Sequence, residues 1–270
     1  MRLSVSNIAW DVEEDDAVAG VLRDLGVDQV DLAPGKYFPD PAAATPAAIA
    51  AVRRRWEDRG FAIAGMQALL FGTSGLNLFN DPEDVMLDRL AAVCRIGGGL
   101  DARALTFGSP RQRDRGDLSE AETSRIALDF FRRIGDRAAE AGVLFCLEPN
   151  PTFYGCNFMT TTDETAAVVA AVGHPAIRMQ LDVGALTMNT EPVIETITRH
   201  AAWIGHVHAS EPKLVTLGDG GSDHAAAGRG LRASRPELTV TIEMAASADE
   251  PHVAAVARAA RLARETYGDV

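Results

Sequence analysis

Short apolar runs alternate with longer amphipathic runs along the whole chain. The first run of each kind spans residues 3–6 and 13–25, and the last amphipathic run spans residues 251–267. Short apolar runs are typical of buried strands, whereas recurrence of apolar residues every three or four positions is typical of helices. The pattern repeats as strand-then-helix units, with no change in composition that would mark a linker.

We count eight such units in 270 residues, which favours a closed (β/α)8 barrel over an open doubly wound sheet. The first predicted strand is not followed by the Gly-x-Gly-x-x-Gly loop of dinucleotide-binding domains, which also argues against the open sheet. The sequence therefore predicts the α/β class and a single (β/α)8 TIM barrel, forming one domain over residues 1–270.

Local signals place two of the helix starts. Ser119 and Glu122 have the spacing of a capping box, which predicts a helix beginning there. The segment 80–82, Asn-Asp-Pro, combines a cap with an early proline and predicts another helix start. We expect this second helix to end at the glycine run 97–99.

Charge narrows the classes of partner. Lys and Arg number 26 against 38 Asp and Glu, which gives a net charge of −12. The negative electrostatic field that results disfavours binding to nucleic acid and to anionic membranes. Local cations could still hold a small anionic substrate. The N-terminal residues are too polar for a signal peptide, and no apolar run has the roughly 18 residues of a membrane helix. Three cysteines without a Cys-x-x-Cys pair suggest buried thiols, so we expect a cytoplasmic protein.

Four consecutive predicted strands, the fifth to the eighth, end in a side chain that can bind a metal ion. These side chains are Glu148, Asp182, His208 and Glu243. In a barrel, the C-terminal ends of the strands surround one cavity. A single acid at a strand end often only caps a loop. The prediction of a metal site therefore depends on all four residues together. Three carboxylates and one imidazole suit a divalent ion, with Mn²⁺ expected and Mg²⁺, Co²⁺ or Zn²⁺ as alternatives.

The same four segments resemble a known superfamily. They read Leu147-Glu148-Pro149-Asn150, Leu181-Asp182-Val183-Gly184, Gly205-His206-Val207-His208 and Ile242-Glu243-Met244. They are similar to the xylose-isomerase-like TIM-barrel superfamily, in its sugar phosphate isomerase/epimerase branch, which includes D-tagatose 3-epimerase-like enzymes. The resemblance covers essentially the whole chain. It implies that Glu148, Asp182, His208 and Glu243 hold the metal, and that Glu148 and Glu243 are the catalytic acid and base.

The implied chemistry is proton transfer next to a ketose carbonyl. Removing that proton needs a base and a stabilised enediolate, which a divalent metal can provide. Two carboxylates on opposite faces of the sugar would remove the proton on one face and return it on the other, which is C3 epimerisation. Return of the proton at the neighbouring carbon would give aldose–ketose isomerisation instead. The expected partner is a small sugar or sugar phosphate, and a homodimer is allowed for.

Two other reaction classes stay open. One is a lyase or dehydratase acting on an inosose or dehydroshikimate-like ketone through the same enediolate. The other is an endonuclease IV-like phosphodiesterase, which would need a three-metal cluster with several more histidines than the six of this chain.

Four residues in three segments depart from the pattern of the family. Ala185 stands where a histidine is common, Lys213 and Leu214 follow the seventh strand where an arginine is common, and Tyr154 stands at about the place of a second glutamate. These departures imply altered substrate recognition, so we expect an unusual sugar or cyclitol.

The candidate substrate contacts lie in the connections that follow the predicted strands. They are Asn150, Tyr154, Lys213, Arg111, Lys36 and Gln67. His206 shares a strand face with His208, so we expect it to support that ligand from behind rather than to bind the ion. The glycine-rich segment 218–224 either binds a phosphate or forms a loop in which Asp223 caps a helix.

Overall fold

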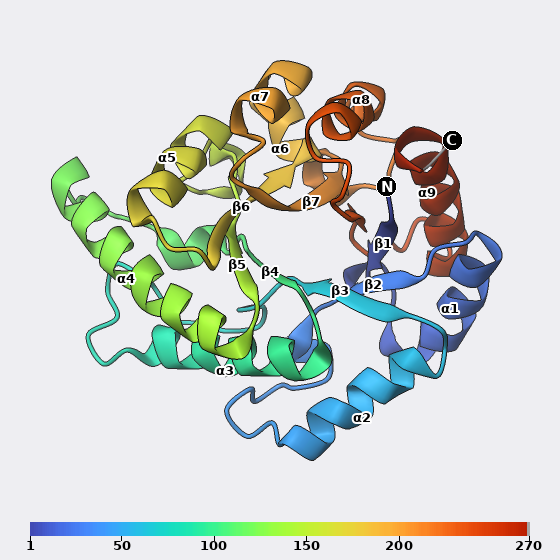
Figure 1. Cartoon of the computed structure of the whole chain (residues 1–270), viewed down its shortest axis with the longest axis horizontal. Helices are drawn as coiled ribbons and strands as arrows, with labels where there is room; N and C mark the ends of the chain where they lie inside the picture. Colours follow the sequence, from blue (N-terminus) through green and yellow to red (C-terminus); the bar gives the residue numbers. More distant parts are fainter. Residues whose placement is uncertain (269–270) are drawn as a thin grey trace.

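Eight parallel strands close into one barrel in the computed structural model, which describes residues 1–268 (Figure 1). Each strand pairs with the next one, and the last pairs with the first. They are β1 (Leu3–Ser6), β2 (Gln29–Leu32), β3 (Ala62–Met66), β4 (Ala104–Phe107), β5 (Leu144–Leu147), β6 (Ile177–Asp182), β7 (Ile204–Ser210) and β8 (Val240–Glu243). The predicted α/β class and single (β/α)8 TIM barrel are confirmed. The domain prediction over residues 1–270 includes two residues outside the described range.

Helices follow the strands and surround the barrel (Figure 1). They are α1 (Asp15–Asp24), α2 (Pro46–Glu57), α3 (Val85–Leu100), α4 (Glu120–Ala141), α5 (Thr162–Val172), α6 (Val183–Met188), α7 (Val193–His200), α8 (His224–Ser234) and α9 (His252–Tyr267). Short 3-10 helices lie in the connections: η1 (Asn7–Ala9), η2 (Val12–Glu14), η3 (Pro34–Lys36), η4 (Pro110–Arg113), η5 (Thr152–Tyr154) and η6 (Pro212–Leu214).

Aromatic packing ties this outer layer to the barrel. Phe107 on β4 is fully buried, and its ring lies 5.4 Å from that of Phe145 on β5 and 6.0 Å from that of Phe131 on α4. Burial of such large side chains contributes much of the favourable free energy of folding. The strands are therefore fixed from outside, and this leaves their C-terminal ends free to carry chemistry.

The capping-box prediction for α4 is confirmed. The Ser119 hydroxyl accepts a hydrogen bond from the backbone N–H of Glu122, and the Glu122 carboxylate accepts one from the backbone N–H of Ser119. For α3, the predicted start at 80–82 is too early. Asp81 does cap the helix, because its carboxylate accepts hydrogen bonds from the N–H groups of Met86 and Leu87, but the helix itself begins at Val85.

The predicted end of α3 at the glycine run is wrong, since the helix continues through these residues to Leu100. The glycines allow close packing. A Cβ atom at Gly98 would lie 2.3 Å from the carbonyl oxygen of Ala141 in α4, and one at Gly97 would lie 2.9 Å from a methyl group of Leu105 in β4. Glycine is unfavourable inside a helix by about 1 kcal/mol relative to alanine, so at these positions close approach outweighs helix propensity.

Candidate active site and metal centre

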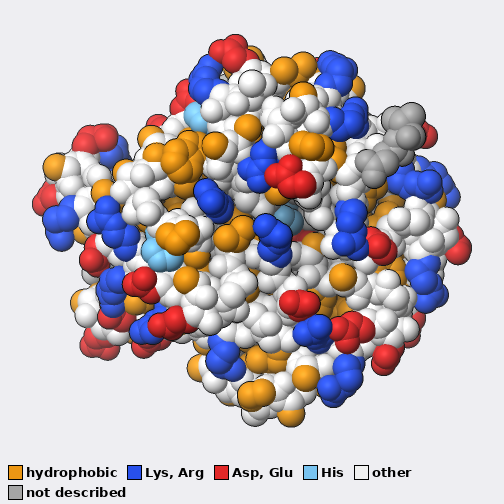
Figure 2. Space-filling view, viewed as in Figure 1, with side chains coloured by type: hydrophobic (Ala, Val, Ile, Leu, Met, Phe, Trp, Pro, Cys, Tyr) orange, Lys and Arg blue, Asp and Glu red, His pale blue; other side chains and the backbone are white. Residues whose placement is uncertain are grey.

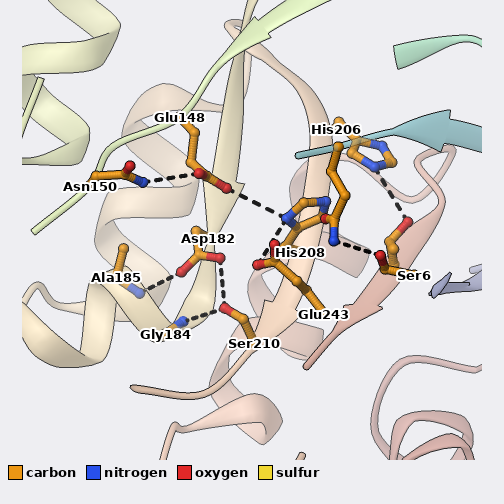
Figure 3. Close-up of polar contacts among 12 residues, drawn as sticks. Ser6, Glu148, Asn150, Asp182, Gly184, Ala185, His206, His208, Ser210 and Glu243 are labelled. Atoms are coloured by element: carbon orange, nitrogen blue, oxygen red, sulfur yellow. Dashed lines mark hydrogen bonds and ion pairs between the residues drawn. The ribbon is translucent and has the colours of Figure 1, made fainter. Parts of the chain in front are cut away.

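The C-terminal ends of β5, β6, β7 and β8 bring four side chains together (Figure 3). One ligand atom from each of Glu148, Asp182, His208 and Glu243 lies within 4.8 Å of the others. His208 Nδ1 is 3.2 Å from Glu243 Oε2 and 3.5 Å from Glu148 Oε1. The four residues that the sequence singled out therefore converge on one point.

The donor atoms of this cluster are incompletely hydrogen-bonded. Glu148 Oε1 and both ring nitrogens of His208 are buried, and none of the three has a hydrogen-bond partner among residues 1–268. The two short contacts of His208 Nδ1 have ion-pair distance without hydrogen-bond geometry. Buried polar atoms in proteins are normally paired. Three carboxylates and one imidazole, with free donor atoms on Glu148 and His208, fit a divalent cation such as Mn²⁺ or Mg²⁺.

The electrostatics of the cluster also favour an added positive charge. Burial raises the pKa of Asp182, and repulsion from Glu148 and Glu243 adds to this effect, bringing it to about 8. For His208, burial acts to lower the pKa, but the two glutamates outweigh it and raise the pKa well above its ordinary value. Three acids in one buried site repel one another, and a cation among them relieves that repulsion.

Hydrogen bonds from neighbouring groups fix the acids in place (Figure 3). Asp182 Oδ2 accepts a hydrogen bond of 2.7 Å from the Ser210 hydroxyl, and that hydroxyl accepts one of 2.9 Å from the N–H of Gly184. Asp182 Oδ1 caps α6 by accepting a bond from the N–H of Ala185. On the other side, the Asn150 amide donates to Glu148 Oε2 at 2.9 Å. The predicted residue Asn150 thus contacts a candidate catalytic acid.

Ser210 was not predicted, because the strand was expected to end at His208. The strand continues to Ser210, and β7 pairs His208 with Asp182 and Ser210 with Glu243. Polar residues at every second position, His206, His208 and Ser210, are the sequence signal that could have revealed this extension.

His206 lies next to His208 and forms, with Asp31 and His208, a second group that could hold a metal ion. Its Nε2 is 2.8 Å from Asp31 Oδ2, and its ring centroid is 5.2 Å from that of His208. Asp31 on β2 is buried and also accepts a hydrogen bond from the Ser4 hydroxyl. Burial acts to raise the pKa of Asp31, but the charge and hydrogen bond of His206 lower it below its ordinary value. Asp31 was missed by the sequence analysis, although an acid in the middle of an apolar strand is a recognisable signal.

Arg113 also supports the site from behind. The side chain is fully buried, and its Nη1 donates a hydrogen bond of 2.7 Å to the backbone oxygen of Glu148. Its Nε contacts Cys156 Sγ at 3.2 Å. Arg113 therefore fixes the end of β5 from inside the protein, and the pocket lining formed by residues 1–268 does not include it.

A pocket of about 820 Å³ opens above the four-residue cluster. Four of the predicted substrate contacts line it, namely Lys36, Gln67, Asn150 and Tyr154. Gln67 is buried and donates a hydrogen bond to the Ser6 hydroxyl. The Lys36 ammonium group donates to the backbone oxygens of Asn7 and Trp10.

The other two predicted contacts lie elsewhere. Arg111 on η4 and Lys213 on η6 are exposed, and the lining contributed by the described residues includes neither. The Lys213 ammonium group lies 5.5 Å from the centre of the Phe153 ring, and its backbone N–H donates to the Tyr154 hydroxyl. This geometry does not favour either cation as a substrate contact, because both side chains lie outside the pocket.

Backbone N–H groups of the glycine-rich segment 218–224 already bind a carboxylate of the protein itself. Buried Glu211 accepts hydrogen bonds from the N–H groups of Gly218 and Ser222, at 2.7 and 2.9 Å, and lies 3.1 Å from His224 Nε2. Asp223 caps α8 through the N–H of Ala226. The amides of Gly218 and Ser222 are therefore already occupied, which agrees with the helix-cap alternative and weighs against phosphate binding in this loop.

The distribution of charge on the surface does not indicate a particular class of binding partner. Figure 2 shows acidic and basic side chains interspersed around the periphery of the face that it draws. None of the helices within residues 1–268 has the length and apolar character needed to cross a membrane.

The closed barrel and its strand-end cluster of acids and histidine define the class of a (β/α)8 barrel with a candidate metal centre. A profile of the xylose isomerase-like TIM barrel family matches residues 20–265. The chain therefore belongs to the xylose isomerase-like TIM barrel family. Among curated proteins, the comparison finds no match to this chain.

Solved structures share this fold at low sequence identity. A D-psicose 3-epimerase from Clostridium cellulolyticum H10, solved with D-tagatose, has a TM-score of 0.81 at 17% identity, with 100% of both chains covered. An L-ribulose 3-epimerase has a TM-score of 0.76 at 18% identity, covering 98% of this chain and 94% of its own. A 3-keto-D-glucoside 4-epimerase from E. coli has a TM-score of 0.78 at 15% identity, covering 98% and 99%. At such identities the likeness shows the fold alone.

Proposed function

We propose that the protein is a divalent-metal-dependent sugar epimerase or isomerase, and that its reaction is C3 epimerisation of a ketose. The observation that carries this proposal is the pair of carboxylates, Glu148 and Glu243, which approach His208 Nδ1 from β5 and β8 at the floor of the pocket. Two acids placed on either side of one substrate carbon are what removal and return of a proton on opposite faces require.

In this mechanism one glutamate takes the proton from C3, and the other delivers a proton to the opposite face. Asn150 keeps the Glu148 carboxylate turned towards the pocket through its hydrogen bond to Oε2. His208 and Asp182 complete the cluster, and Ser210 holds Asp182. A bound divalent cation would supply charge stabilisation for the enediolate oxygens. Glu148, Asp182, His208 and Glu243 would hold that cation, with Mn²⁺ as the proposed ion.

The structural neighbours support the choice of an epimerase. Two of them are named as ketose 3-epimerases, and a third as a 4-epimerase of a keto-glucoside. All three names describe a change of configuration at a sugar carbon. The proposed partner is accordingly a small sugar or sugar phosphate in the cytoplasm, with no role for nucleic acid or membrane.

The test is a set of ketoses and ketose phosphates incubated in D₂O with the Mn²⁺-loaded protein and followed by proton NMR. Deuterium at C3 together with the epimeric sugar is the expected result. Deuterium at C1 or C2 would instead identify an aldose–ketose isomerase, and an enone absorbing in the near ultraviolet would identify the dehydratase alternative. Absence of exchange in every sugar of the set would contradict the proposal.

A further inference from the structure

The rim of the pocket presents an aromatic side chain to solvent. Phe71, in the connection between β3 and α3, lines the pocket and is 83% exposed. Leaving a phenyl ring in water forfeits the free energy that burial of such a ring provides. An exposed aromatic residue beside a binding pocket is therefore a candidate contact for something that covers it.

The backbone around Phe71 holds the ring in this position. The preceding residues Leu69 and Leu70 are buried, so the connection is anchored directly before the exposed ring. The N–H of Phe71 donates to the carbonyl oxygen of Ala68, and both the N–H and the hydroxyl of Thr73 donate to that of Leu70. Ala68 adopts a left-handed conformation with φ of 54°. Non-glycine residues with such strain cluster at ligand-binding sites.

The pocket is larger than one hexose needs. At about 820 Å³ it lies in the upper part of the range of about 300–1,000 Å³ that is typical of sites for drug-sized ligands. The cluster of acids occupies the ends of β5 to β8, whereas Phe71 and its neighbours Pro39, Ala68 and Gly72 come from the connections after β2 and β3. A sugar whose ketone lies at the acids therefore leaves room between its far end and Phe71.

The pocket lining combines apolar side chains with two cations. Ala185, Leu214, Ala245 and Ala246 are apolar. Arg89 donates a hydrogen bond to the backbone oxygen of Pro39, and its buried Nε has no hydrogen-bond partner among residues 1–268. Lys36, which also lines the pocket, already donates to two backbone oxygens and is surrounded by four acids that interact with its charge. A phosphate near Lys36 would have to compete with those acids. An attached sugar ring can accept a hydrogen bond from Arg89 through a hydroxyl and present C–H bonds to Phe71, and an aryl group can present a flat face to it.

We propose that this pocket contains a second subsite, in which Phe71 stacks on a neutral ring attached to the far end of the ketose. The substrate is then a ketose that carries a glycosyl or aryl substituent, rather than a free hexose. This inference rests on the proposed epimerase function for its reaction, but the subsite can be measured by binding alone.

The test compares D-fructose with isomaltulose, which is fructose carrying a glucosyl group on O6, and with 6-O-benzyl-D-fructose. Calorimetric Kd values and kcat/KM for exchange at C3 are measured with the Mn²⁺-loaded full chain. We expect at least one extended ketose to bind about tenfold more tightly than fructose. Whether the glucosyl or the benzyl sugar gains more identifies the class of the attached ring.

Two variants isolate the aromatic contact. Phe71→Ala should reduce the preference for the extended ketose about fivefold, and Phe71→Trp should retain it, since it keeps an aromatic face. Phe153→Ala is the matched control, because Phe153 is also exposed, at 62%, but does not line the pocket formed by residues 1–268. The control should leave the preference within about twofold.

Equal binding of all three sugars by the wild type would overturn the subsite, as would equal losses of preference in Phe71→Ala and Phe153→Ala. These outcomes are distinct from failure of the proposed function. Tight binding of an extended ketose that depends on Phe71, without any exchange at C3, would keep the subsite and reject the epimerase.

Discussion

Two buried histidine–glutamate groups lie near the C-terminal end of β7, and they differ in how their polar atoms are paired. In the first, His208 lies between Glu148 and Glu243, and three of the polar atoms of the group lack hydrogen-bond partners among residues 1–268. In the second, His224 bonds to Glu211 through Nε2 and to the Tyr267 hydroxyl through Nδ1. The glutamates of both groups line the pocket, but of the two groups the first alone has buried polar atoms without hydrogen-bond partners among residues 1–268.

This difference indicates that the His208 group is a functional site and that the His224–Glu211 group stabilises the fold. Glu211 accepts hydrogen bonds from two backbone N–H groups in addition to its contact with His224, and these bonds lower its pKa to about 2 against the opposing effect of burial. A buried acid that is fully paired stabilises the folded chain, whereas unpaired buried acids destabilise it and persist where function needs them. We therefore expect substitutions in the first group to change activity and those in the second to change stability.

The largest expected effect is on turnover. Glu148→Gln and Glu243→Gln should each lower kcat for exchange at C3 by about 10²- to 10⁴-fold, because a neutral amide can neither take nor deliver the proton. Turnover is followed by NMR in D₂O.

Glu250→Gln is the matched control, because Glu250 pairs with Arg258 at the surface. It should retain wild-type turnover. Full activity in Glu148→Gln or Glu243→Gln would refute the two-carboxylate mechanism.

The fold and the four ligand candidates could be predicted because their signals are local. Apolar runs ending in Glu148, Asp182 or Glu243 can be recognised without knowing what lies across the barrel. The supporting residues could not be predicted this way. Asp31 contacts His206 from a strand 175 residues away in sequence, so nothing next to either residue indicates the pair.

The end of α3 was mispredicted and the buried position of Arg113 was not predicted, for a related reason. The glycine run 97–99 does not end the helix, because the chain uses its lack of side chains for packing against Ala141 and Leu105. The burial of Arg113 depends on its contacts with Cys156 and with the end of β5, which a local sequence pattern does not reveal. Tertiary contacts decided both cases.

The second prediction concerns the paired group. Glu211→Gln should lower the free energy of unfolding at pH 7 by about 2–3 kcal/mol, because the folded carboxyl has a pKa of about 2 against an ordinary value of 4.5. A carboxyl whose pKa is lowered on folding stabilises the protein above the unfolded pKa. That contribution is lost as the pH falls from about 4.5 towards 2.

The measurement is urea unfolding of the wild type and Glu211→Gln between pH 3 and pH 7, with turnover as a second readout. The difference in stability should shrink as the solution becomes more acidic, and turnover should change far less than in Glu148→Gln. A constant difference across this pH range would show that the charge of Glu211 is not the cause.

A smaller effect is expected at Ser210, which lies on β7 between the two groups. Its hydroxyl donates to Asp182 and accepts from the N–H of Gly184, so it fixes the orientation of a candidate metal ligand. Ser210→Ala should weaken Mn²⁺ affinity by about tenfold, as is typical when a partner of a metal ligand is removed. Titration of metal-free protein with Mn²⁺ measures the affinity, and Ser210→Thr should recover part of it by restoring the hydroxyl.

The smallest effects are expected at the two cations that lie outside the pocket. Arg111→Ala and Lys213→Ala should each change kcat/KM for a neutral ketose by less than about twofold, because neither exposed side chain reaches the cluster of acids and exposed charges are screened by salt. Steady-state rates at low and at physiological ionic strength provide the check. A loss of tenfold or more in either variant would place that cation in the recognition of substrate and would mean that the pocket rearranges when a sugar binds.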